Sequence, residues 1–281
     1  MLVSTPIGNL ADLSPRAVEA LAAADAIACE DTRRTGRLLQ HAGVTKPRLI
    51  VANEHTEAAA ADEIVRLLDG GAIVAVVTDA GTPGVSDPGE RLVAAALRAG
   101  HAVEAVPGPS AALAALVVSG LPTGRFVVEG FLPRSGRARR QRLAELDGER
   151  RTTVLYEAPH RLLRTLNDLA AVLGPDRPVA IGRELTKRHE ETWRGTLAEA
   201  IGRAETIEPR GEHVIVVAGA PAPAAATATD VTIALERALA DGHDRKSAVA
   251  EVAAALDVPK RVVYDESLRL TGRGDAMPPG S

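Results

Sequence analysis

Apolar runs with strand character alternate with helix-length segments over the first 108 residues, and this alternation limits the fold more than any other feature. The clearest run, AIVAVVTDAG at 72–81, is rich in β-branched residues, which is typical of a strand covered on both faces. Helix patterns lie on either side, for example RAVEALAAAD at 16–25 and RLVAAALRAG at 91–100. Because strands joined by helices of this length pair in parallel, the sequence predicts an α/β fold with a mostly parallel sheet.

The alternation is interrupted at 107–122, where PGPSAALAALVVSGLP contains a helix pattern without a polar face. We place a domain junction there, which predicts an N-terminal α/β domain at 1–108 and a second α/β domain at 109–222. The Ala-, Pro- and Thr-rich stretch APAPAAATATD at 220–230 is typical of a linker. Three helix patterns follow it and predict a small helical module, similar to a helix-turn-helix, at 230–270.

Composition narrows the class of protein. The chain has 281 residues, of which 46% are apolar, so it can bury a substantial core. A single cysteine, Cys29, excludes a disulfide framework and a multi-cysteine zinc site, and no metal is expected. The start of the chain lacks a signal-peptide pattern, and no apolar run approaches the roughly 18 residues of a membrane helix. We therefore expect a cytoplasmic protein without a membrane partner.

Positive charge is concentrated in one part of the chain. The net charge is −4, but residues 109–222 carry more basic than acidic side chains. The densest run is RSGRARRQRL at 134–143, with arginines and no acidic residue. Such a run is either the solvated start of a helix or a patch that contacts phosphates, and the sequence leaves both interpretations open.

Familiar nucleotide and catalytic motifs are absent: the chain has no P-loop, no G-x-G-x-x-G, no H-E-x-x-H and no G-x-S-x-G. Instead, four turns rich in Gly or Pro follow predicted strands: TPIGNL at 5–10, DAGTPGVSDPG at 79–89, PGPSA at 107–111 and YEAPH at 156–160. Loops of this kind bind through main-chain groups, which suits a neutral or zwitterionic ligand with an adenine and a ribose. The alternative is that each is only a tight turn.

Eight segments stand in order within residues 3–218: TPIGNLADLSPRA, CEDTRRTGRLL, DAGTPGVSDPG, PGPSA, LPTGRFVVEGFLP, YEAPHRL, RELTKRHEE and GEHVIVV. Together they resemble the ribosomal RNA small subunit methyltransferase I (RsmI) family of the tetrapyrrole methylase superfamily. The resemblance implies two α/β domains with a cofactor cleft between them, usually in a homodimer. It also implies 2′-O-methylation of cytidine 1402 in 16S ribosomal RNA of the small ribosomal subunit, with S-adenosylmethionine as methyl donor.

The resemblance places the cofactor against the loops at the strand ends. Porphyrin-type members usually carry Gly-Asp-Pro where this chain has Gly81-Thr82-Pro83, which favours an RNA substrate over a tetrapyrrole. The expected cofactor-binding residues are Pro6, Asp79, Ala80, Gly81, Thr82, Val85, Ser110, Ala111, Tyr156, Glu157, Ala158, Gly211, Glu212 and His213.

A base that takes the ribose hydroxyl proton adds to the rate, and Glu30, Asp31 and His55 are the candidates because each leaves a predicted strand end. Alternatively, Asp31 caps the following helix while Arg33 pairs with an acidic residue. A lone histidine such as His55 is more often structural than catalytic.

Arginine suits phosphate oxygens, and methylation of a ribose in folded RNA needs a grip on the backbone. The expected RNA contacts are Arg33, Arg34, Arg134, Arg137, Arg139, Arg140, Lys187 and Arg188. Two other functions stay open. One is methylation of a tetrapyrrole or another small molecule, and the other is nucleic-acid binding without catalysis, through the helical tail.

Overall fold

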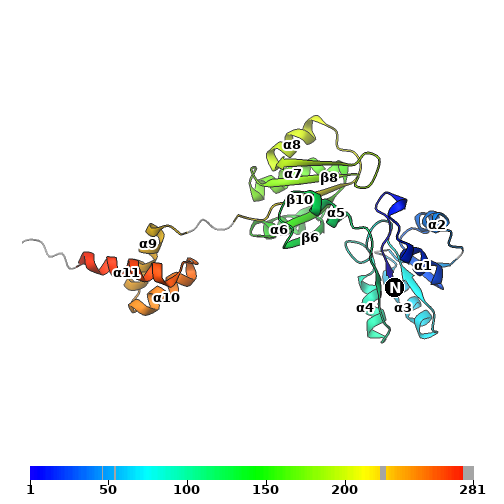
Figure 1. Ribbon diagram of the computed structural model, residues 1–281, viewed down its shortest axis with the longest axis horizontal. Helices are drawn as coiled ribbons and strands as arrows, with labels where there is room; N and C mark the ends of the chain where they lie inside the picture. The colour runs from blue at the N-terminus through cyan, green and yellow to red at the C-terminus, as the bar shows by residue number, and fades with distance from the viewer. Residues whose placement is uncertain (46, 54, 222–225, 275–281) are drawn as a thin grey trace, which may run out of the picture. The chain divides into compact units, whose positions relative to one another are not determined.

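The computed structural model describes residues 1–45, 47–53, 55–221 and 226–274 (Figure 1). The chain divides into two compact units, Met1–Ala220 and Pro221–Ser281. The first unit contains both β-sheets, and the second consists of helices in its described part. We call the part of the first unit around the first sheet the first lobe (1–106), and the part around the second sheet the second lobe (111–217).

The first sheet is parallel throughout, in the order β3-β2-β4-β1-β5. Its strands are β1 (Leu2–Val3), β2 (Ala26–Cys29), β3 (Arg48–Val51), β4 (Val74–Val76) and β5 (Ala105–Val106). The helices between them are α1 (Pro15–Ala23), α2 (Thr32–His41), α3 (Glu57–Asp69) and α4 (Glu90–Arg98), with a short 3-10 helix at Leu10–Asp12. Two buried apolar clusters pack on the sheet, and both include residues of β2 and β4. The predicted α/β class is therefore confirmed.

Local sequence signals begin the helices where we expected them. Ser14 caps α1, because its Oγ accepts a hydrogen bond from the main-chain N of Ala17 at 3.1 Å, and Pro15 takes the first helical position. Helix α2 begins in the same way after Asp31, whose Oδ1 accepts from the main-chain N of Arg33 at 2.8 Å. Both caps place the helix start directly after a loop at a strand end.

The second sheet is mixed, in the order β6-β7-β10-β8-β9. Its strands are β6 (Phe126–Phe131), β7 (Thr152–Glu157), β8 (Pro178–Arg183), β9 (Glu191–Thr196) and β10 (His213–Val217). Strands β6 and β7 are parallel, whereas β10 runs antiparallel to β7 and β8. Helices α6 (Gly136–Asp147), α7 (Leu162–Leu173) and α8 (Leu197–Thr206) pack on the sheet through one buried cluster.

Helix α5 (Ala111–Val118) packs on the second sheet through a different cluster, against residues of β7, β8 and β10. Its buried residues are Ala112, Ala115 and Leu116, while Leu113 and Val117 are 48% and 69% exposed. The helix pattern without a polar face therefore has two apolar sides, of which the sheet covers one.

The second unit is a bundle of α9 (Ala228–Ala240), α10 (Arg245–Ala255) and α11 (Lys260–Gly274) around a small apolar core. Asp244 caps α10, since its Oδ1 accepts from the main-chain N of Ser247 at 2.8 Å. Pro259 directly precedes α11 and its carbonyl accepts from the main-chain N of Val262 at 2.8 Å.

The strands of the first sheet all precede residue 108, and those of the second sheet all follow it. Both sheets nevertheless belong to one compact unit, so the separate domains 1–108 and 109–222, like the module bounds 230–270, stay predictions. Within the described ranges, no helix combines the length and apolar character needed to cross a bilayer.

Candidate active site

A cavity of about 390 Å³ lies between the two lobes, where the loops after β2 and β4 face the carboxyl end of β7 and the start of β10. The first lobe contributes Ile7, Glu30, Arg34, Asp79, Ala80, Gly81, Thr82, Val85, Ser86 and Asp87. The second lobe, with the segment leading into it, contributes Ser110, Ala111, Phe131, Tyr156, Glu157, Ala158, Pro159, Leu185, Glu212, His213 and Val214. This placement at strand ends is where open α/β sheets bind ligands.

Three of the glycine- and proline-rich loops hold one another in place. Thr5 and Gly81 exchange main-chain hydrogen bonds of 2.8 and 3.1 Å, and Gly81 has a φ of +93°, a conformation that favours glycine. The Thr82 hydroxyl donates to the carbonyl of Pro109 at 3.3 Å and accepts from the Ser4 hydroxyl at 3.2 Å. The loops therefore form one preorganised wall rather than three independent turns.

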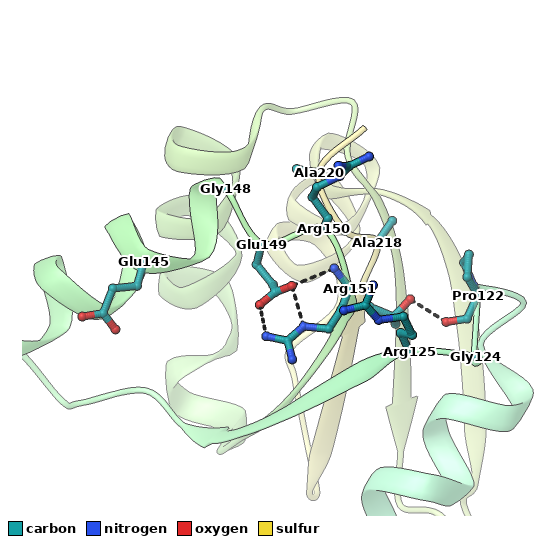
Figure 2. Close-up of a pocket in the computed structure, with 12 residues that line it drawn as sticks. Pro122, Gly124, Arg125, Glu145, Gly148, Glu149, Arg150, Arg151, Ala218 and Ala220 are labelled. Carbon is teal, nitrogen blue, oxygen red and sulfur yellow. Dashed lines mark hydrogen bonds and ion pairs between the residues drawn. The ribbon is translucent and has the colours of Figure 1, made fainter. Parts of the chain in front are cut away.

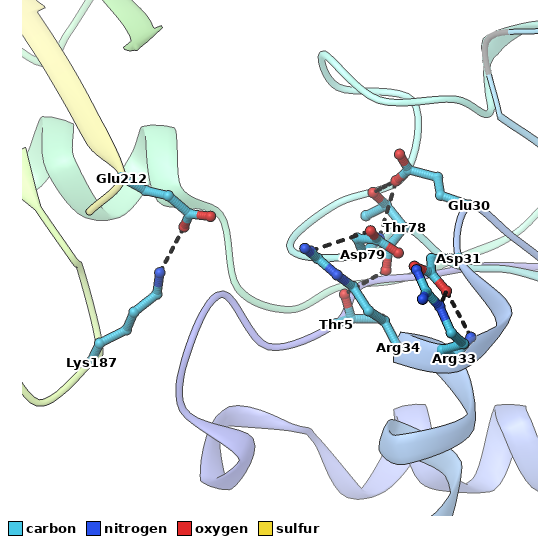
Figure 3. A network of polar contacts seen from close by, with 9 residues as sticks. All are labelled: Thr5, Glu30, Asp31, Arg33, Arg34, Thr78, Asp79, Lys187 and Glu212. Atoms are coloured by element: carbon cyan, nitrogen blue, oxygen red, sulfur yellow. Dashed lines mark hydrogen bonds and ion pairs between the residues drawn. The ribbon is translucent and has the colours of Figure 1, made fainter. Parts of the chain in front are cut away.

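A polar network lies behind this wall (Figure 3). One Glu30 carboxylate oxygen accepts from the hydroxyl of Thr78 and, at 3.1 Å, from the main-chain N of Asp79. Arg34 forms an ion pair with Asp79 at 3.3 Å, yet the other Asp79 oxygen is buried without a hydrogen-bond partner among the described residues. Burial and the nearby Glu30 raise the pKa of Asp79, against the opposing effect of Arg34. These groups make the first-lobe side of the cavity acidic.

Asp87 lies on the same side of the cavity, in the second half of the 79–89 loop. Burial raises its pKa to about 6, with a further contribution from the charge of Glu30. The neighbouring Ser86 contacts the second lobe at Gly130, which has a φ of +74° and lies where the register of β6 shifts. A Cβ at Gly130 would lie 2.7 Å from the Ser86 Oγ, so the two lobes meet closely at this point.

The second-lobe wall rests on a buried carboxylate. Glu157, 2% exposed, pairs with Arg161 at 3.1 Å and accepts from the main-chain N of Ala158 at 3.0 Å. It also accepts from the hydroxyl of Thr165, which in turn accepts from Arg139 at 2.9 Å. Because both carboxylate oxygens of Glu157 already bind groups within the second lobe, this side chain stabilises the structure of the wall.

Aromatic and imidazole rings complete this wall. Phe131 and Tyr156 stand with ring centroids 5.6 Å apart and tilted by 46°. His213 is 5% exposed, and burial together with the charge of Arg183 lowers its pKa, which favours the neutral imidazole. These three rings thus offer apolar and neutral surface to a ligand, beside the carboxylates of Glu157 and Glu212 in the same wall.

Most of the predicted cofactor residues line the cavity. The ones that do so are Asp79, Ala80, Gly81, Thr82, Val85, Ser110, Ala111, Tyr156, Glu157, Ala158, Glu212 and His213. Pro6 and Gly211 do not, although their neighbours Ile7 and Glu212 do. A cofactor role for each of these residues stays a prediction.

Sequence reasoning did not select Ile7, Ser86, Asp87, Phe131, Pro159, Leu185 and Val214 as site residues. Ser86 and Asp87 were within reach, because they belong to the 79–89 loop. Phe131 ends the strand in LPTGRFVVEGFLP, a segment to which we assigned no role.

The three candidate bases lie in different surroundings. Glu30 lines the cavity, whereas Asp31 and His55 do not. Asp31 caps α2 and pairs with Arg33 at 3.0 Å, and these hydrogen bonds with Arg33 lower its pKa to about 2. His55 precedes α3 in an exposed turn, with its main-chain N donating to Asn53 at 3.0 Å. The capping interpretation thus describes the Asp31 contacts.

The predicted RNA contacts include exposed side chains and one side chain that is buried and bound to other residues of the protein. Arg139 is 3% exposed, with its guanidinium bound to Asp168 at 2.8 Å, the Pro133 carbonyl at 3.0 Å and Thr165. It cannot reach a phosphate without breaking this network, so the expectation for Arg139 is corrected. Arg134, Arg137, Arg140 and Arg188 are exposed.

Lys187 has a bridging position. Its Nζ donates to Glu212 at 2.8 Å (Figure 3) and to Glu184 at 2.9 Å. Its aliphatic stem lies against Gly8 of the first lobe. Burial acts against its charge, but Glu212 and Glu184 outweigh it and raise its pKa. Arg33 is exposed and pairs with Asp31, and Arg34 lines the cavity.

A larger hollow of about 1150 Å³ lies at the opposite end of β7 (Figure 2). Arg125, Arg150 and Arg151 line it, but Arg151 is held by both oxygens of Glu149 at 2.8 and 2.6 Å. Glu145 adds a second acidic residue. Its mixed charge and its position within the second lobe distinguish this hollow from the cavity between the lobes.

Comparison with known proteins agrees with this architecture. Residues 1–201 match the family "Tetrapyrrole (Corrin/Porphyrin) Methylases". The ribosomal RNA small subunit methyltransferase I of Synechocystis sp. is 46% identical over 275 residues, which cover 97% of this chain and 98% of the relative. The chain belongs to the ribosomal RNA small subunit methyltransferase I family.

Family members differ in length. The methyltransferase I of Thermotoga maritima is 47% identical over 219 residues, which are 78% of this chain but 97% of that relative. The matched length is close to that of the Met1–Ala220 unit.

A solved structure shows the same fold. The uroporphyrin-III-C-methyltransferase of Thermus thermophilus superposes with a TM-score of 0.55 at 24% identity, covering 77% of this chain and 92% of that one. The methyltransferase I family therefore shares its fold with enzymes that act on tetrapyrroles.

Proposed function

We propose that this protein transfers a methyl group from S-adenosylmethionine to the 2′-hydroxyl of cytidine 1402 in 16S ribosomal RNA. The observation that carries the proposal is the identity of 46–47% to small subunit methyltransferases I over 97–98% of their length. The rRNA-modifying relatives also support the proposal that the protein works in the cytoplasm.

The cavity has the features that an S-adenosylmethionine site needs. Its volume of about 390 Å³ lies in the range of small-molecule pockets. The Gly81 turn, with its positive φ, brings main-chain groups to the wall. One buried Asp79 oxygen, which has no partner among the residues that the structure describes, offers an acceptor for a ligand donor. When bound, S-adenosylmethionine supplies an activated methyl group on a sulfonium.

The residues of this chain are then proposed to position the reacting groups and to exclude water from them. The interlocked 5–10, 79–89 and 107–111 loops hold one side of the cavity, and the Phe131–Tyr156 pair closes another with apolar surface. Alignment of a hydroxyl with the methyl carbon supplies most of the rate in such a reaction. The two walls are therefore proposed to fix the cofactor and the ribose against each other.

The RNA backbone is proposed to bind Arg33, Arg34, Arg134, Arg137, Arg140 and Arg188, with Lys187 bridging the lobes. Arg137 and Arg140 lie in the first turns of α6, which follows directly after the cavity residue Phe131 and the 132–135 connection. Guanidinium groups at that position suit phosphates flanking a ribose in the cavity.

We further propose a homodimer that uses the exposed side of α5. That side presents Leu113 and Val117 without a covering element among the described residues. Apolar side chains arranged in this way are typical of subunit interfaces.

Two measurements test the proposed activity. Calorimetry is expected to detect binding of S-adenosylmethionine, and methylation of small ribosomal subunits is expected to map to one 2′-O position. Transfer to a porphyrin precursor but not to RNA would establish the tetrapyrrole alternative instead. Binding of RNA without any methyl transfer would support the non-catalytic alternative.

A further inference from the structure

Phe131, the last residue of the edge strand β6, lies between two hollows of the surface. It lines the cavity between the lobes and also a second hollow of about 360 Å³, which we call the β6–α6 groove. The other residues that line this groove are Glu129, Pro133, Ala138, Gln141, Arg142 and Glu145. Among the described residues, Phe131 is the one that borders both hollows. The groove therefore begins at Phe131, where the cavity ends, and lies between β6 and α6.

A bulge in β6 turns the side chain of Phe131 toward the cavity. The register with β7 shifts between Val128 and Gly130, so one residue of β6 is extra at this point. Because side chains alternate along a strand, Phe131 would otherwise lie on the opposite face of the sheet from Val128. With the bulge, Phe131 pairs with Tyr156 and shares the face on which Val128 and Tyr156 pack against the cluster of α5. Bulges next to binding sites commonly redirect a side chain in this way.

The ring of Phe131 is supported by one neighbour and is otherwise open to solvent. Its centroid lies 5.6 Å from that of Tyr156, with an angle of 46° between the rings. Phe131 is nevertheless 56% exposed, whereas Phe126, at the other end of β6, is 38% exposed and lines neither hollow. An exposed aromatic ring in a fixed position is the group on which proteins stack unpaired RNA bases.

Free positive charges border the groove. Arg134 and Arg137 are exposed, and neither forms an ion pair with any residue that the structure describes. Arg137 lies one helical turn before Gln141, so it stands on the groove side of α6. Inside the groove, Arg142 is already held by two glutamates. The groove thus combines an aromatic ring at one end with available guanidinium groups at its border, which is the combination that single-stranded nucleic acids bind.

We infer that Phe131 stacks the base of the nucleotide next to the methylated one, and that the RNA strand continues from there along the β6–α6 groove. This inference rests on the function proposed above. With the target ribose in the cavity, the neighbouring base meets the exposed ring, and the phosphates beyond it reach Arg134 and Arg137. A stacked neighbour holds the strand in one orientation and so aligns the target hydroxyl with the methyl group. Phe131 takes no part in bond making, and its role is to position the substrate.

Phe131→Leu in the full-length protein tests the inference, with Phe126→Leu on the same strand as the matched control. Leucine keeps an apolar side chain but has no aromatic face for a base. We expect kcat/KM for methylation of small ribosomal subunits to fall about 5- to 150-fold, the range for loss of one stacked base, mainly through KM. Calorimetric affinity for S-adenosylmethionine and the denaturant midpoint are expected to stay within about twofold of wild type. Phe126→Leu is expected to keep kcat/KM within about twofold.

Phe131→Tyr separates stacking from packing, because it keeps the aromatic face. It is expected to retain at least about half of the wild-type kcat/KM. A Phe131→Leu value within about twofold of wild type would overturn the inference, and so would equal losses in Phe131→Leu and Phe131→Tyr. A loss of cofactor affinity as large as the loss of kcat/KM would place the ring against the cofactor and overturn it as well. In each of these cases the proposed function stands. A wild-type protein that methylates no ribosomal subunit would instead overturn the proposed function, and the role of Phe131 with it.

Discussion

The hydroxyl of Thr82 shows how one side chain joins parts of the chain that are distant in sequence. It binds the carbonyl of Pro109 and the hydroxyl of Ser4, so it links the loops after three different strands. A carboxylate at this position would place a negative charge against the Pro109 carbonyl. The threonine that favours an RNA substrate in the sequence is therefore also a structural link in this wall.

Thr82→Val keeps the shape of the side chain and removes its hydroxyl. Because the Pro109 carbonyl then loses a donor, we expect a loss of about 1 kcal/mol in the free energy of unfolding. Affinity for S-adenosylmethionine is expected to fall by a similar factor, roughly 3- to 10-fold. Denaturant unfolding and calorimetry measure both quantities. Unchanged values in both would show that the three loops hold without this link.

The raised pKa of Asp87 predicts a pH dependence of stability that needs no substrate. Folding raises this pKa from its ordinary value of 3.8 to about 6, so the folded state binds the proton more tightly than the unfolded state. The free energy of unfolding is therefore expected to fall as the pH rises from about 4 to 6, and to stay lowered above 6. After allowance for solvent screening, the effect is on the order of 1 kcal/mol.

Asp87→Asn is expected to remove this pH dependence and to be the more stable protein at pH 7.5. Thermal unfolding between pH 4 and 8, without cofactor, measures the difference. A wild-type curve that matches the variant at every pH would contradict the raised pKa.

At the scale of elements, the arginines of helix α6 have two roles, one structural and one proposed for RNA binding. Arg139 points into the lobe and ties α6 to α7 through Asp168 and Thr165, while Arg137 and Arg140 remain exposed. The run RSGRARRQRL thus contains one structural arginine among candidate RNA contacts. The helical spacing places Arg139 and Arg137 on different sides of α6. The ion-pair partner of Arg139, Asp168, lies 29 residues away in the sequence, so the sequence alone did not identify Arg139 as a structural residue.

Arg139→Ala and Arg140→Ala form a matched pair on this helix. Arg139→Ala leaves Asp168 and Thr165 without their donor, so we expect a loss of about 2 kcal/mol in stability. Arg140→Ala is expected to change stability by less than about 0.5 kcal/mol, while weakening subunit binding and lowering its salt dependence. Denaturant unfolding and filter binding distinguish them. Equal destabilisation by the two variants would contradict the division of tasks.

Helix α5 offers a test of the proposed dimer. Val117 is 69% exposed and carries no part of the buried cluster. Val117→Glu is therefore expected to leave the fold intact and to convert a dimer into a monomer, because a charge at an interface costs several kcal/mol when it is desolvated. Light scattering after gel filtration measures the mass. A variant that keeps the wild-type mass would place the interface elsewhere.

At the scale of the whole molecule, local patterns predicted the first sheet better than the second. The strand–helix alternation implies parallel neighbours, and the first sheet has them. In the second sheet, β10 lies between β7 and β8, an order set by pairings between residues 30 or more positions apart, which no local pattern encodes. The same limit applies to the site: the loops could be identified from their residues, whereas the burial of Asp87 in the cavity depends on how the two lobes fold against each other.

The division into two compact units predicts that a truncated chain folds and binds the cofactor. Residues 1–220 contain both sheets and the cavity, and their length is close to that of the match with the Thermotoga maritima relative. We expect residues 1–220 to fold and to bind S-adenosylmethionine within about threefold of the full chain. Calorimetry and thermal unfolding check this. Failure of the truncated chain to fold would show that the helical unit supports the rest of the molecule.

The contact between Ser86 and Gly130 sets a spacing between the lobes that one carbon atom would change. Every residue larger than glycine at position 130 brings its Cβ to about 2.7 Å from the Ser86 Oγ, and also strains a backbone with a φ of +74°. To accept it, the 79–89 loop or the bulged strand β6 has to move. Position 130 therefore limits how closely the two lobes approach each other, and a substitution there would change the spacing of the two walls although Gly130 itself does not line the cavity.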